Sequence, residues 1–514
     1  MTEPAPDRPV AFRRRVLVNT LSTGVANIWA IVVGLVTLPL LLHGMGAASF
    51  GTWVLVQTFS AVTGWISLAD LGVGTATTRN VATKAARDDR DGVTTTVTSA
   101  LSVFVGVGAL CALVLVTVGR RFLPALFHTP HALRADLRFA LALFAVQVVV
   151  DLVTEGCEAC LEGLQRVDLS RGADAVRRTA VAAATAAVAL AGGGLKGVAA
   201  ASLAASVGGM AVAVVLLARH LPAGGRRPSP AIVRELLAYG RTVAVLRPLG
   251  VVHRSVDRVV VGGVFGPSAV ALVEVATQMM NGADAILSAA SYAVIPSAAW
   301  LDSRGDRTTL VELLERGTKY SLLATLPVVG LGIALAGPIV HLWVGARYSA
   351  APGLAAVALL YIALVAPLQV GSNLLLAVGE AGAVLRSAAA AIVVNVALSV
   401  TLVHVTGIVG VFQATLLAAC VLLPPLTRSV LREVGISLRQ FLATAVTPAV
   451  APLVALGAVS GACVAAPLPD VATLVLGALG GFGAFVVVAL RFSMSRSELA
   501  ELRRLAARTP ATAP

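Results

Sequence analysis

Fourteen long stretches of mostly apolar residues constrain what this chain can fold into. A stretch of about 20 apolar residues crosses a bilayer as a helix, because its backbone polar groups must all be hydrogen-bonded inside the segment. Only 13% of the residues are charged, about half the usual share in soluble domains. The sequence therefore predicts an all-α, polytopic membrane protein of about 14 transmembrane helices. These are expected at 16–42, 48–70, 93–118, 137–158, 174–191, 197–218, 236–262, 267–299, 319–345, 352–378, 383–404, 407–427, 441–465 and 471–490.

Basic residues gather on alternate sides of these spans. The N-terminal tail, the C-terminal tail and the connections 71–92, 219–235 and 300–318 are rich in arginine. The cytoplasmic connection after the fourth span is also predicted to hold Arg166, Arg171, Arg177 and Arg178. By the positive-inside rule, both termini are predicted to lie in the cytoplasm, with the chain in the plasma membrane. The basic outer loop 119–136, which holds Arg120, Arg121 and Arg134, departs from this rule.

Several classes of function are not expected for this chain. The outer connections are too short for a catalytic domain, and no inner connection carries a phosphate-binding glycine loop, so neither an enzyme nor an ATP-driven pump is predicted. No basic cluster interleaves with aromatic residues, which argues against nucleic acid as a partner. Cys157 and Cys160 lack the second pair of ligands that zinc requires, so they are predicted to be buried thiols. No cofactor and no metal are expected.

A short turn indicates an internal repeat. Segment 43–50, between the first two spans, resembles segment 263–270, which lies 220 positions later. Two related halves with a site between them are a frequent transporter architecture, although glycine-rich turns between apolar helices also match by chance. The predicted organisation is a cytoplasmic tail (1–15), an N-terminal lobe (16–218), a linker (219–235), a C-terminal lobe (236–430), two additional spans (431–490) and a basic tail (491–514).

The seventh span carries a stripe of arginines. Arg247, Arg254 and Arg258 are spaced seven and four residues apart, which places them on one helix face. An ionisable residue in a span costs roughly 2.5–3.5 kcal/mol and usually faces a cavity. These arginines are therefore predicted to bind substrate, with Asp257 as a nearby counter-ion. Alternatively, Arg247 and Arg258 extend to opposite membrane surfaces while Arg254 pairs with Asp257.

The fourth span carries a stripe of carboxylates. Asp151, Glu155, Glu158 and Glu162 follow at steps of four, three and four residues. They require opposing cations or bound protons in a bilayer. Asp151, Glu155 and Glu158, together with Asp257, are predicted to take part in gating or ion coupling. The alternative is that Glu158 and Glu162 are a solvated helix end.

The eighth span is polar along one face, with Glu274, Gln278 and Asn281 as predicted substrate-binding residues. Spans seven and eight are joined by a short turn and run antiparallel. Arg258 and Glu274 should therefore lie at similar depth, where an ion pair between them is the alternative to ligand contact.

Several short motifs resemble a known family in their order and spacing, over spans one to eight. The chain resembles the polysaccharide-export flippases of the multidrug/oligosaccharidyl-lipid/polysaccharide (MOP) superfamily. The motifs are Asn19 through Pro39, Gly46, Phe50, Gly51 and Trp53, then Asp70–Gly74, Thr78–Arg79, Gly163–Asp168 and Ser255–Gly262.

The resemblance implies two six-helix lobes facing each other in a V, with two extra C-terminal helices. It also implies a cation-lined cavity, mapping onto Arg247, Arg254 and Arg258, that receives an anionic pyrophosphate-linked sugar. At 5%, the aromatic content is low for stacking on sugars, so the glycan is not identified.

The predicted function is transport of a polyprenyl-pyrophosphate-linked oligosaccharide from the inner to the outer leaflet for surface polysaccharide synthesis. Expected partners are this anionic lipid-linked substrate, membrane lipids, and the polymerase and glycosyltransferases of the same pathway. A lipid II flippase and a drug–cation antiporter of the same superfamily are the alternatives. A membrane polymerase or ligase would be expected to carry a large outer loop, which the sequence lacks.

Overall fold

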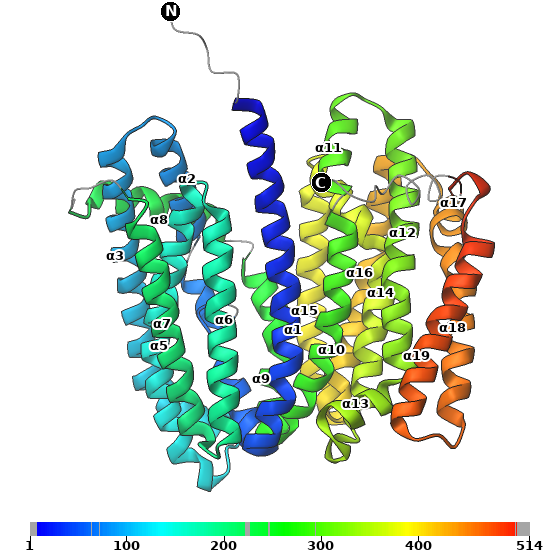
Figure 1. Ribbon diagram of the computed structural model, residues 1–514, viewed down its shortest axis with the longest axis horizontal. Helices are drawn as coiled ribbons and strands as arrows, with labels where there is room; N and C mark the ends of the chain where they lie inside the picture. Colours follow the sequence, from blue (N-terminus) through cyan, green and yellow to red (C-terminus); the bar gives the residue numbers. More distant parts are fainter. Residues whose placement is uncertain are drawn as a thin grey trace, which may run out of the picture. The chain divides into compact units, whose positions relative to one another are not determined.

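Every regular element in the described part of the chain is a helix (Figure 1). The computed structural model describes residues 8–62, 64–70, 72–221, 227–244, 247–292, 294–498 and 500; side chains are described from residue 28 onward, except at 241–249, 253 and 254. The all-α prediction is confirmed.

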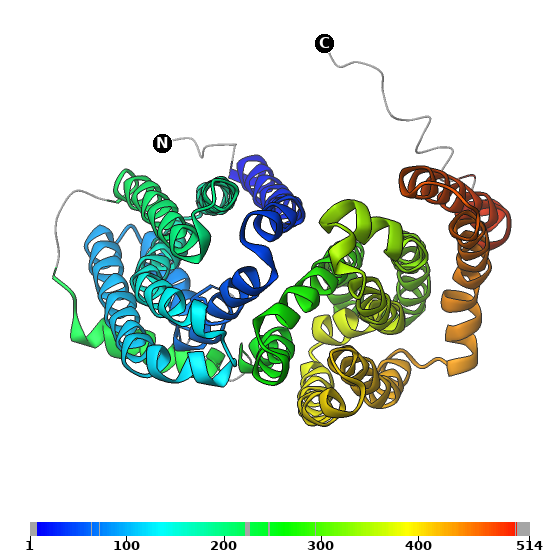
Figure 2. The same ribbon diagram turned by 90° about the horizontal axis from the view of Figure 1, so that it is seen from below.

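The chain divides into two compact units, Met1–Glu274 and Val275–Pro514. In the N-terminal unit α1, α3, α5, α6 and α7 run alongside one another, as the end-on view in Figure 2 shows. The elements up to the end of this unit are α1 (Arg8–Gln57), η1 (Trp65–Asp70), α2 (Val73–Ala85), α3 (Arg90–Val114), the π-helical turn η2 (Leu115–Gly119), α4 (Arg120–Leu126), α5 (His131–Gly163), α6 (Val167–Leu190), α7 (Gly194–Ala218), α8 (Pro230–Ala244) and α9 (Arg247–Phe265).

The boundary between the units falls within α10 (Pro267–Tyr292). In the C-terminal unit, leucine and valine side chains of α11, α12, α14 and α16 form a buried core. The remaining elements are α11 (Val294–Ser303), α12 (Arg307–Ala334), α13 (Ala336–Val344), η3 (Ala346–Tyr348), α14 (Ala351–Ala377), α15 (Ala381–Thr406), α16 (Val409–Val434), α17 (Leu438–Phe441), η4 (Leu442–Val446), α18 (Thr447–Ala465), α19 (Asp470–Val488) and η5 (Ala489–Ser493).

Each of the fourteen predicted spans falls on helix, but some are broken. The second predicted span leaves the helix after Gln57, and the ninth bends by 75° between α12 and α13. Among the described residues, ten helices are long and apolar enough to cross a membrane, or eleven if this bent pair is one span. Because α6 carries five charged residues in its first half, it does not qualify by composition. The chain is thus a multi-pass membrane protein, and the count of fourteen stays a prediction.

The predicted outer loop 119–136 is mostly helical, which corrects the sequence analysis. The helix continues through α4 to Leu126, and α5 already begins at His131, so that only 127–130 form the turn. The amide of Phe127 donates to the carbonyl of Leu123 at 3.0 Å, which closes the last turn of α4. Continued helix keeps the backbone polar groups paired near the bilayer.

The core of the N-terminal unit lies where α2, α3, α5 and α7 meet. It includes Val81, Val97, Leu161 and Ala213, with Cys157 and Cys160 fully buried among them. Both cysteines are free thiols. The prediction of buried thiols is confirmed, because these side chains fill core volume as small apolar groups do.

Two turns in different units have the same construction. Asp89 caps α3 by accepting a bond from the amide of Gly92 at 2.8 Å, and Asp306 caps α12 through the amide of Thr309 at 3.1 Å. The preceding residues, Asp88 and Gly305, have φ of 54° and 67°. The backbone hydrogen bonds around both turns match one for one, at a constant separation of 217 positions.

Two further pairs of turns repeat at nearly the same separation. Gly46 and Gly266 have φ of 74° and 79° and lie 220 positions apart. Gln165 and Gly379 have φ of 61° and 91° and lie 214 positions apart. Together with the capped turns, these pairs support the internal repeat. The limits of the two six-span lobes stay a prediction.

A buried ion pair holds the segment after the last span. Glu498 Oε1 accepts from Lys319 Nζ on α12 at 2.5 Å and from the Tyr320 hydroxyl at 2.8 Å. Ser495 and Glu498 also cap each other, since Glu498 Oε2 accepts from the Ser495 amide and Ser495 Oγ accepts from the Glu498 amide. The Lys319 and Glu498 side chains are only 11% and 6% exposed. This arrangement attaches the chain end to α12.

Replacing Glu498 by Gln should destabilise the protein and change its acid sensitivity. Burial raises the pKa of Glu498, but the bonds from Lys319, Ser495 and Tyr320 outweigh it and lower this pKa from 4.5 to about 2. The difference corresponds to about 3 kcal/mol at neutral pH. This stabilisation is complete above pH 4.5 and is lost as the pH falls towards 2. Denaturant unfolding in detergent at pH 7 and at pH 3 measures it.

The matched control is Glu312→Gln, which removes an ion pair to Arg316 whose partners are each 50% exposed. Exposed pairs of this kind contribute less than about 1 kcal/mol. Equal effects of the two variants at pH 7 would contradict the assignment.

Candidate functional site

The tight turn between α5 and α6 brings two charged helix faces together. The amide of Arg166 donates to the carbonyl of Leu161 at 2.9 Å, and Gln165 takes a φ of 61°. The helices therefore leave the turn antiparallel. The carboxylates of α5 share one helix face, and Arg171, Asp174 and Arg178 of α6 follow at steps of three and four residues. The carboxylates of α5 therefore lie opposite the arginines of α6, which are the cations that such a stripe requires in a bilayer.

Ion pairs connect the two helices along their length. Near the turn, Glu162 lies 3.1 Å from Arg171 and accepts a bond from Ser170 Oγ at 3.3 Å. Farther along, Arg177 Nη1 lies 3.4 Å from Asp151 Oδ1. Asp151 is 12 residues from the end of α5, which is roughly 18 Å at 1.5 Å per residue. The contact is therefore deep within a membrane-spanning helix.

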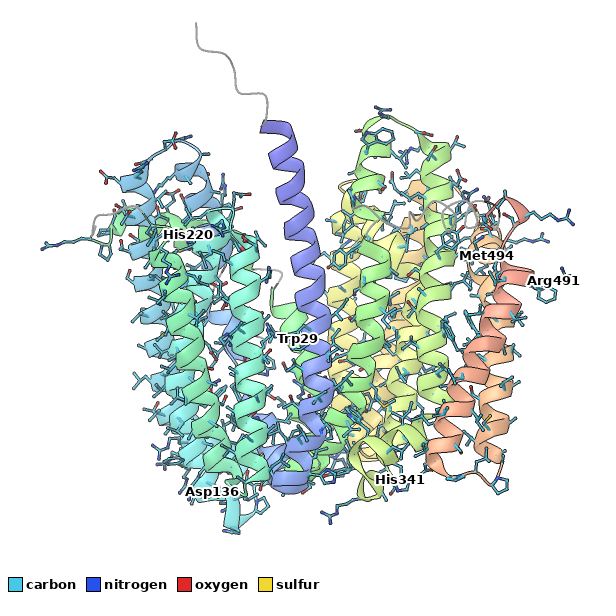
Figure 3. The ribbon with its side chains drawn as sticks, in the orientation of Figure 1. Trp29, Asp136, His220, His341, Arg491 and Met494 are labelled. Atoms are coloured by element: carbon cyan, nitrogen blue, oxygen red, sulfur yellow. The ribbon has the colours of Figure 1, made fainter. Side chains whose placement is uncertain are left out.

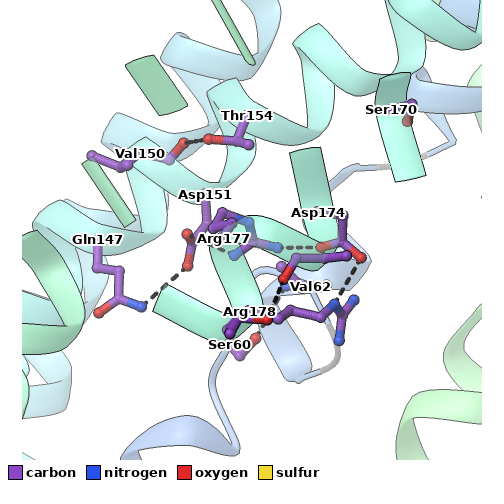
Figure 4. A network of polar contacts seen from close by, with 12 residues as sticks. Ser60, Val62, Gln147, Val150, Asp151, Thr154, Ser170, Asp174, Arg177 and Arg178 are labelled. Atoms are coloured by element: carbon purple, nitrogen blue, oxygen red, sulfur yellow. Dashed lines mark hydrogen bonds and ion pairs between the residues drawn. The ribbon is translucent and has the colours of Figure 1, made fainter. Parts of the chain in front are cut away.

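Asp174 joins two arginines on its own helix. Its Oδ1 accepts from Arg177 Nη2 at 2.9 Å, and its Oδ2 accepts from Arg178 Nε at 2.7 Å (Figure 4). Gln147 donates to Asp151 Oδ2 at 3.3 Å and thereby extends the network along α5. Asp151 and Arg177 are 6% and 8% exposed. We call the set the charge cluster, namely Asp151, Glu155, Glu158, Glu162, Arg171, Asp174, Arg177 and Arg178.

Two cavities meet at this cluster. One, of about 300 Å³, is lined from α1, α5, α6 and α7 and is named here the tryptophan cavity after Trp53. The other, of about 530 Å³, is lined from α2, α5 and α6 and is named the glutamate cavity after Glu155, Glu158 and Glu162. Both are lined by Val62, Asp151, Arg177 and Arg178. The cluster thus has access to both spaces.

Some buried polar atoms at the two cavities have no hydrogen-bond partner among the described residues. They include Glu158 Oε1 and the Nε atoms of Arg171 and Arg177 in the charge cluster, and Gln147 Oε1 at the tryptophan cavity. Buried polar atoms in proteins are normally hydrogen-bonded. The arrangement therefore suits a polar ligand or water at the cavity walls.

The internal repeat shows that the fold does not depend on these charges. At the separation of 214 positions, Asp151, Glu155, Glu158 and Glu162 correspond to Val365, Gln369, Ser372 and Leu376 of α14. Likewise Arg171, Asp174, Arg177 and Arg178 correspond to Leu385, Ala388, Ala391 and Ile392 of α15. The same helix pair forms without a single charge at these positions. Because charge in a span is costly, the cluster is a candidate functional site.

Of the predicted substrate-binding residues, Arg258 and Glu274 form an ion pair. Arg258 Nε lies 2.8 Å from Glu274 Oε2, and Nη2 lies 3.1 Å from Oε1, a bidentate geometry. This is the pair that the similar depth of the two residues indicated. Arg247 and Arg254 are on α9, but their side chains lie outside the described residues.

The other predicted residues are distributed over both units. Asp257 is partly buried on α9, while Gln278 and Asn281 lie on the part of α10 that belongs to the C-terminal unit. Gln278 is partly buried and Asn281 is exposed. Their predicted roles in substrate binding or coupling stay predictions.

The basic half of the charge cluster is not predicted from the sequence. Its pattern of basic residues places Arg171, Arg177 and Arg178 in a cytoplasmic connection, whereas all three lie on α6 and line the glutamate cavity. The signal was present, since the fifth predicted span, 174–191, itself contains Asp174, Arg177 and Arg178 at helical spacing. What the sequence lacked was the pairing of α6 with α5.

Replacing Asp174 by Asn should strongly destabilise the N-terminal unit. It removes the partner that Arg177 and Arg178 share, and uncompensated buried charge costs about 3–5 kcal/mol. The double variant Asp174→Asn/Arg177→Gln should lose less than the sum of its single variants. Thermal unfolding in detergent measures both effects.

The control is Asp136→Asn, which removes an exposed ion pair to Lys196 at 2.9 Å. Figure 3 places Asp136 at the opposite end of the unit from His220. If Asp174→Asn cost no more than Asp136→Asn, the cluster would not be a coupled network.

Solved structures with the same fold are transporters. A lipid II flippase, MurJ, in an inward closed conformation aligns with a TM-score of 0.71 and 13% identity, over 96% of this chain and 100% of that one. An inward-facing multidrug resistance MATE family transporter of the MOP superfamily aligns with a TM-score of 0.61 and 16% identity, over 81% and 94%. A MATE structure in a bent conformation aligns with a TM-score of 0.54 and 14% identity, over 85% and 97%. At these identities the likeness concerns the fold.

The chain thus shares its fold with membrane transporters, one of them described as a transporter of the MOP superfamily. The chain belongs to the family described as polysaccharide biosynthesis protein, whose model matches residues 16–299, more than half of its length. No curated protein matches the chain significantly. The resemblance noted in the sequence is thereby confirmed.

Proposed function

We propose that the chain is a flippase that moves a polyprenyl-pyrophosphate-linked oligosaccharide from the inner to the outer leaflet of the plasma membrane for surface polysaccharide synthesis. The observation that carries the proposal is the charge cluster at two cavities, in a helix pair whose repeat counterpart carries no charge at the equivalent positions. Membership in the polysaccharide biosynthesis family supports the same substrate class.

Arginines supply the interaction with the pyrophosphate in this proposal. The Arg178 side chain is 39% exposed and lines both cavities, so it can exchange Asp174 for a substrate phosphate. Arg247, Arg254 and Arg258 of α9 provide the further cations predicted from the sequence. A planar guanidinium binds phosphate oxygens in pairs, which suits it for this role.

Carboxylates provide the conformational switch. When a pyrophosphate binds Arg178, Asp174 loses one of its two arginine partners. The distribution of ion pairs between α5 and α6 then changes. Glu155 and Glu158 at the glutamate cavity are the candidates for gating or ion coupling, as are Asp151 and Asp257. Substrate binding and release then favour different states of the transporter, which is the requirement for alternating access.

Two other transport functions use the same fold. Lipid II is also a lipid-linked pyrophosphate, and the MurJ fold spans nearly the whole chain, so a lipid II flippase is the second candidate. A cation antiporter is the third, because the glutamate cavity is lined by five carboxylates and four arginines. Rescue of a strain depleted of its lipid II flippase, without rescue of polysaccharide export, would favour the second candidate.

Removing either of two arginine charges should strongly reduce polysaccharide export. In a deletion strain complemented with the chain, we expect Arg254→Ala and Arg178→Ala each to lower exported polysaccharide at least tenfold. Arg254→Lys should retain part of the activity, because the charge remains while the paired geometry is lost. Arg87→Ala, at an exposed arginine of the α2–α3 turn, is the control. Full export by the Arg254→Ala protein at normal abundance would exclude the arginine stripe from substrate binding.

A gate between α5 and α9 can be tested by cross-linking. If Glu155 and Glu158 approach Arg247 when the transporter closes on the cytoplasmic side, cysteines at these positions should form disulfides in native membranes. The pairs are Glu155→Cys with Arg247→Cys and Glu158→Cys with Arg247→Cys, each in a background without the native cysteines. Gly108→Cys with Val149→Cys is the positive control, because a Cβ atom at position 108 lies 3.5 Å from the Val149 Cβ, a separation that a disulfide can bridge. Linking of the control alone would contradict the gate.

A further inference from the structure

The end of the N-terminal unit that contains the 127–130 turn carries a basic surface that the transport mechanism does not use. Arg120 and Arg121 lie on α4, and Arg134 and Arg138 lie on the first two turns of α5. α4 and α5 pack against each other and are antiparallel across the turn, so these residues occupy the same end of the unit. We call these four residues the arginine patch.

The patch has almost no internal charge compensation. Asp136 is the only carboxylate in 115–140, and it pairs with Lys196 of α7 at 2.9 Å. Arg134 donates through Nε to the backbone carbonyl of Thr129 at 3.1 Å. This bond holds the Arg134 side chain against the turn. Within the part of the chain that the structure describes, none of the four arginines forms an ion pair. The patch therefore attracts anions from outside the unit.

Apolar side chains surround the patch and point away from the core. Phe122 and Leu126 are 59% and 51% exposed on α4, and Phe139 is 46% exposed on α5. In a chain that spans a membrane, such residues contact lipid chains, while arginines beside them lie at the level of the headgroups. The patch thus offers arginines to the phosphate of a phospholipid and apolar side chains to its acyl chains.

The repeat shows that the patch is an addition to the fold. The equivalent segment of the other unit, at separations of 214 to 217 positions, is 335–353, where the basic residues are His341 and Arg347. His341 of that segment contacts Asp470. A helix–turn–helix of this kind therefore folds without four arginines, which in the N-terminal unit act against the positive-inside rule.

We propose that the arginine patch is a binding site for anionic phospholipids, whose phosphate groups contact Arg120, Arg121 and Arg138 while their chains lie along Phe122 and Phe139. The start of α5 contributes as well, because its first turn has no side-chain cap and presents the positive end of a 33-residue helix. A bound lipid compensates the patch and holds this end of the unit at the headgroup level. The inference is independent of which substrate is transported.

Photo-cross-linking in vesicles tests the proposal. The full chain is reconstituted with a trace of phosphatidylglycerol that carries a photoreactive headgroup, and labelled peptides are mapped by mass spectrometry. We expect labelling of 118–139 that unlabelled phosphatidylglycerol suppresses and phosphatidylcholine does not. The variant Arg120→Gln/Arg121→Gln/Arg138→Gln should lower this labelling at least tenfold, since one basic residue near an anionic surface changes affinity about fivefold.

The matched control removes three exposed arginines at the opposite end of the same unit, Arg87→Gln/Arg90→Gln/Arg219→Gln, and should leave labelling of 118–139 unchanged. If the patch variant fails to fold in detergent, 1 M salt applied to the wild type replaces it, because screening must then suppress the labelling. Labelling that phosphatidylcholine suppresses equally, or that neither the variant nor salt reduces, overturns the proposal. Suppression by undecaprenyl pyrophosphate but not by phosphatidylglycerol also overturns it and assigns the patch to the transported lipid.

Discussion

Charge inside a membrane-spanning bundle is tolerated where an opposite charge is held within contact distance, and this constraint organises the N-terminal unit. Arg177 sits between Asp151 and Asp174, and Arg178 shares Asp174. Each of these charged side chains offsets the desolvation cost of the side chain that it contacts. The burial of charge on α5 is therefore stabilised by α6, and the burial of charge on α6 by α5. Two cavities meet at this cluster, and Asp151, Arg177 and Arg178 line both of them.

The internal repeat separates features that both units share from charges that only the N-terminal unit carries. The turns that recur at separations of 214 to 220 positions are built from capping aspartates and residues of positive φ, which are local requirements of the backbone. The charged positions of α5 and α6 have apolar or uncharged counterparts in α14 and α15. Natural sequences keep costly groups mostly at functional sites, so this difference between related helix pairs marks α5 and α6 as the candidate site.

Helix breaks distinguish this bundle from a set of uniform spans. The second predicted span stops at Gln57, and the ninth bends by 75° after Ala334. Local backbone bonds pair groups at both breaks, since the amide of Thr58 donates to the carbonyl of Val54 at 3.0 Å and the amide of Leu335 donates to that of Leu331 at 2.8 Å. At the chain end, the Lys319–Glu498 pair attaches the segment after the last span to α12 of the same unit. These contacts depend on side chains that are 179 positions apart, and no local pattern indicates them.

The sequence by itself determined the fold class, the approximate helix positions, the buried thiols and the family, because apolar runs, turn residues and short motifs act over a few helical turns. It also indicated the Arg258–Glu274 pair, since a tight turn fixes the depth of its two neighbours. The structure alone decided that Arg171, Arg177 and Arg178 line the same cavity as the carboxylates of α5, and that the basic segment 119–136 is helical except at 127–130. Which faces of α5 and α6 meet depends on how α1 and α7 pack around them, and that packing is set by the whole bundle rather than by the spacing of charges along one helix.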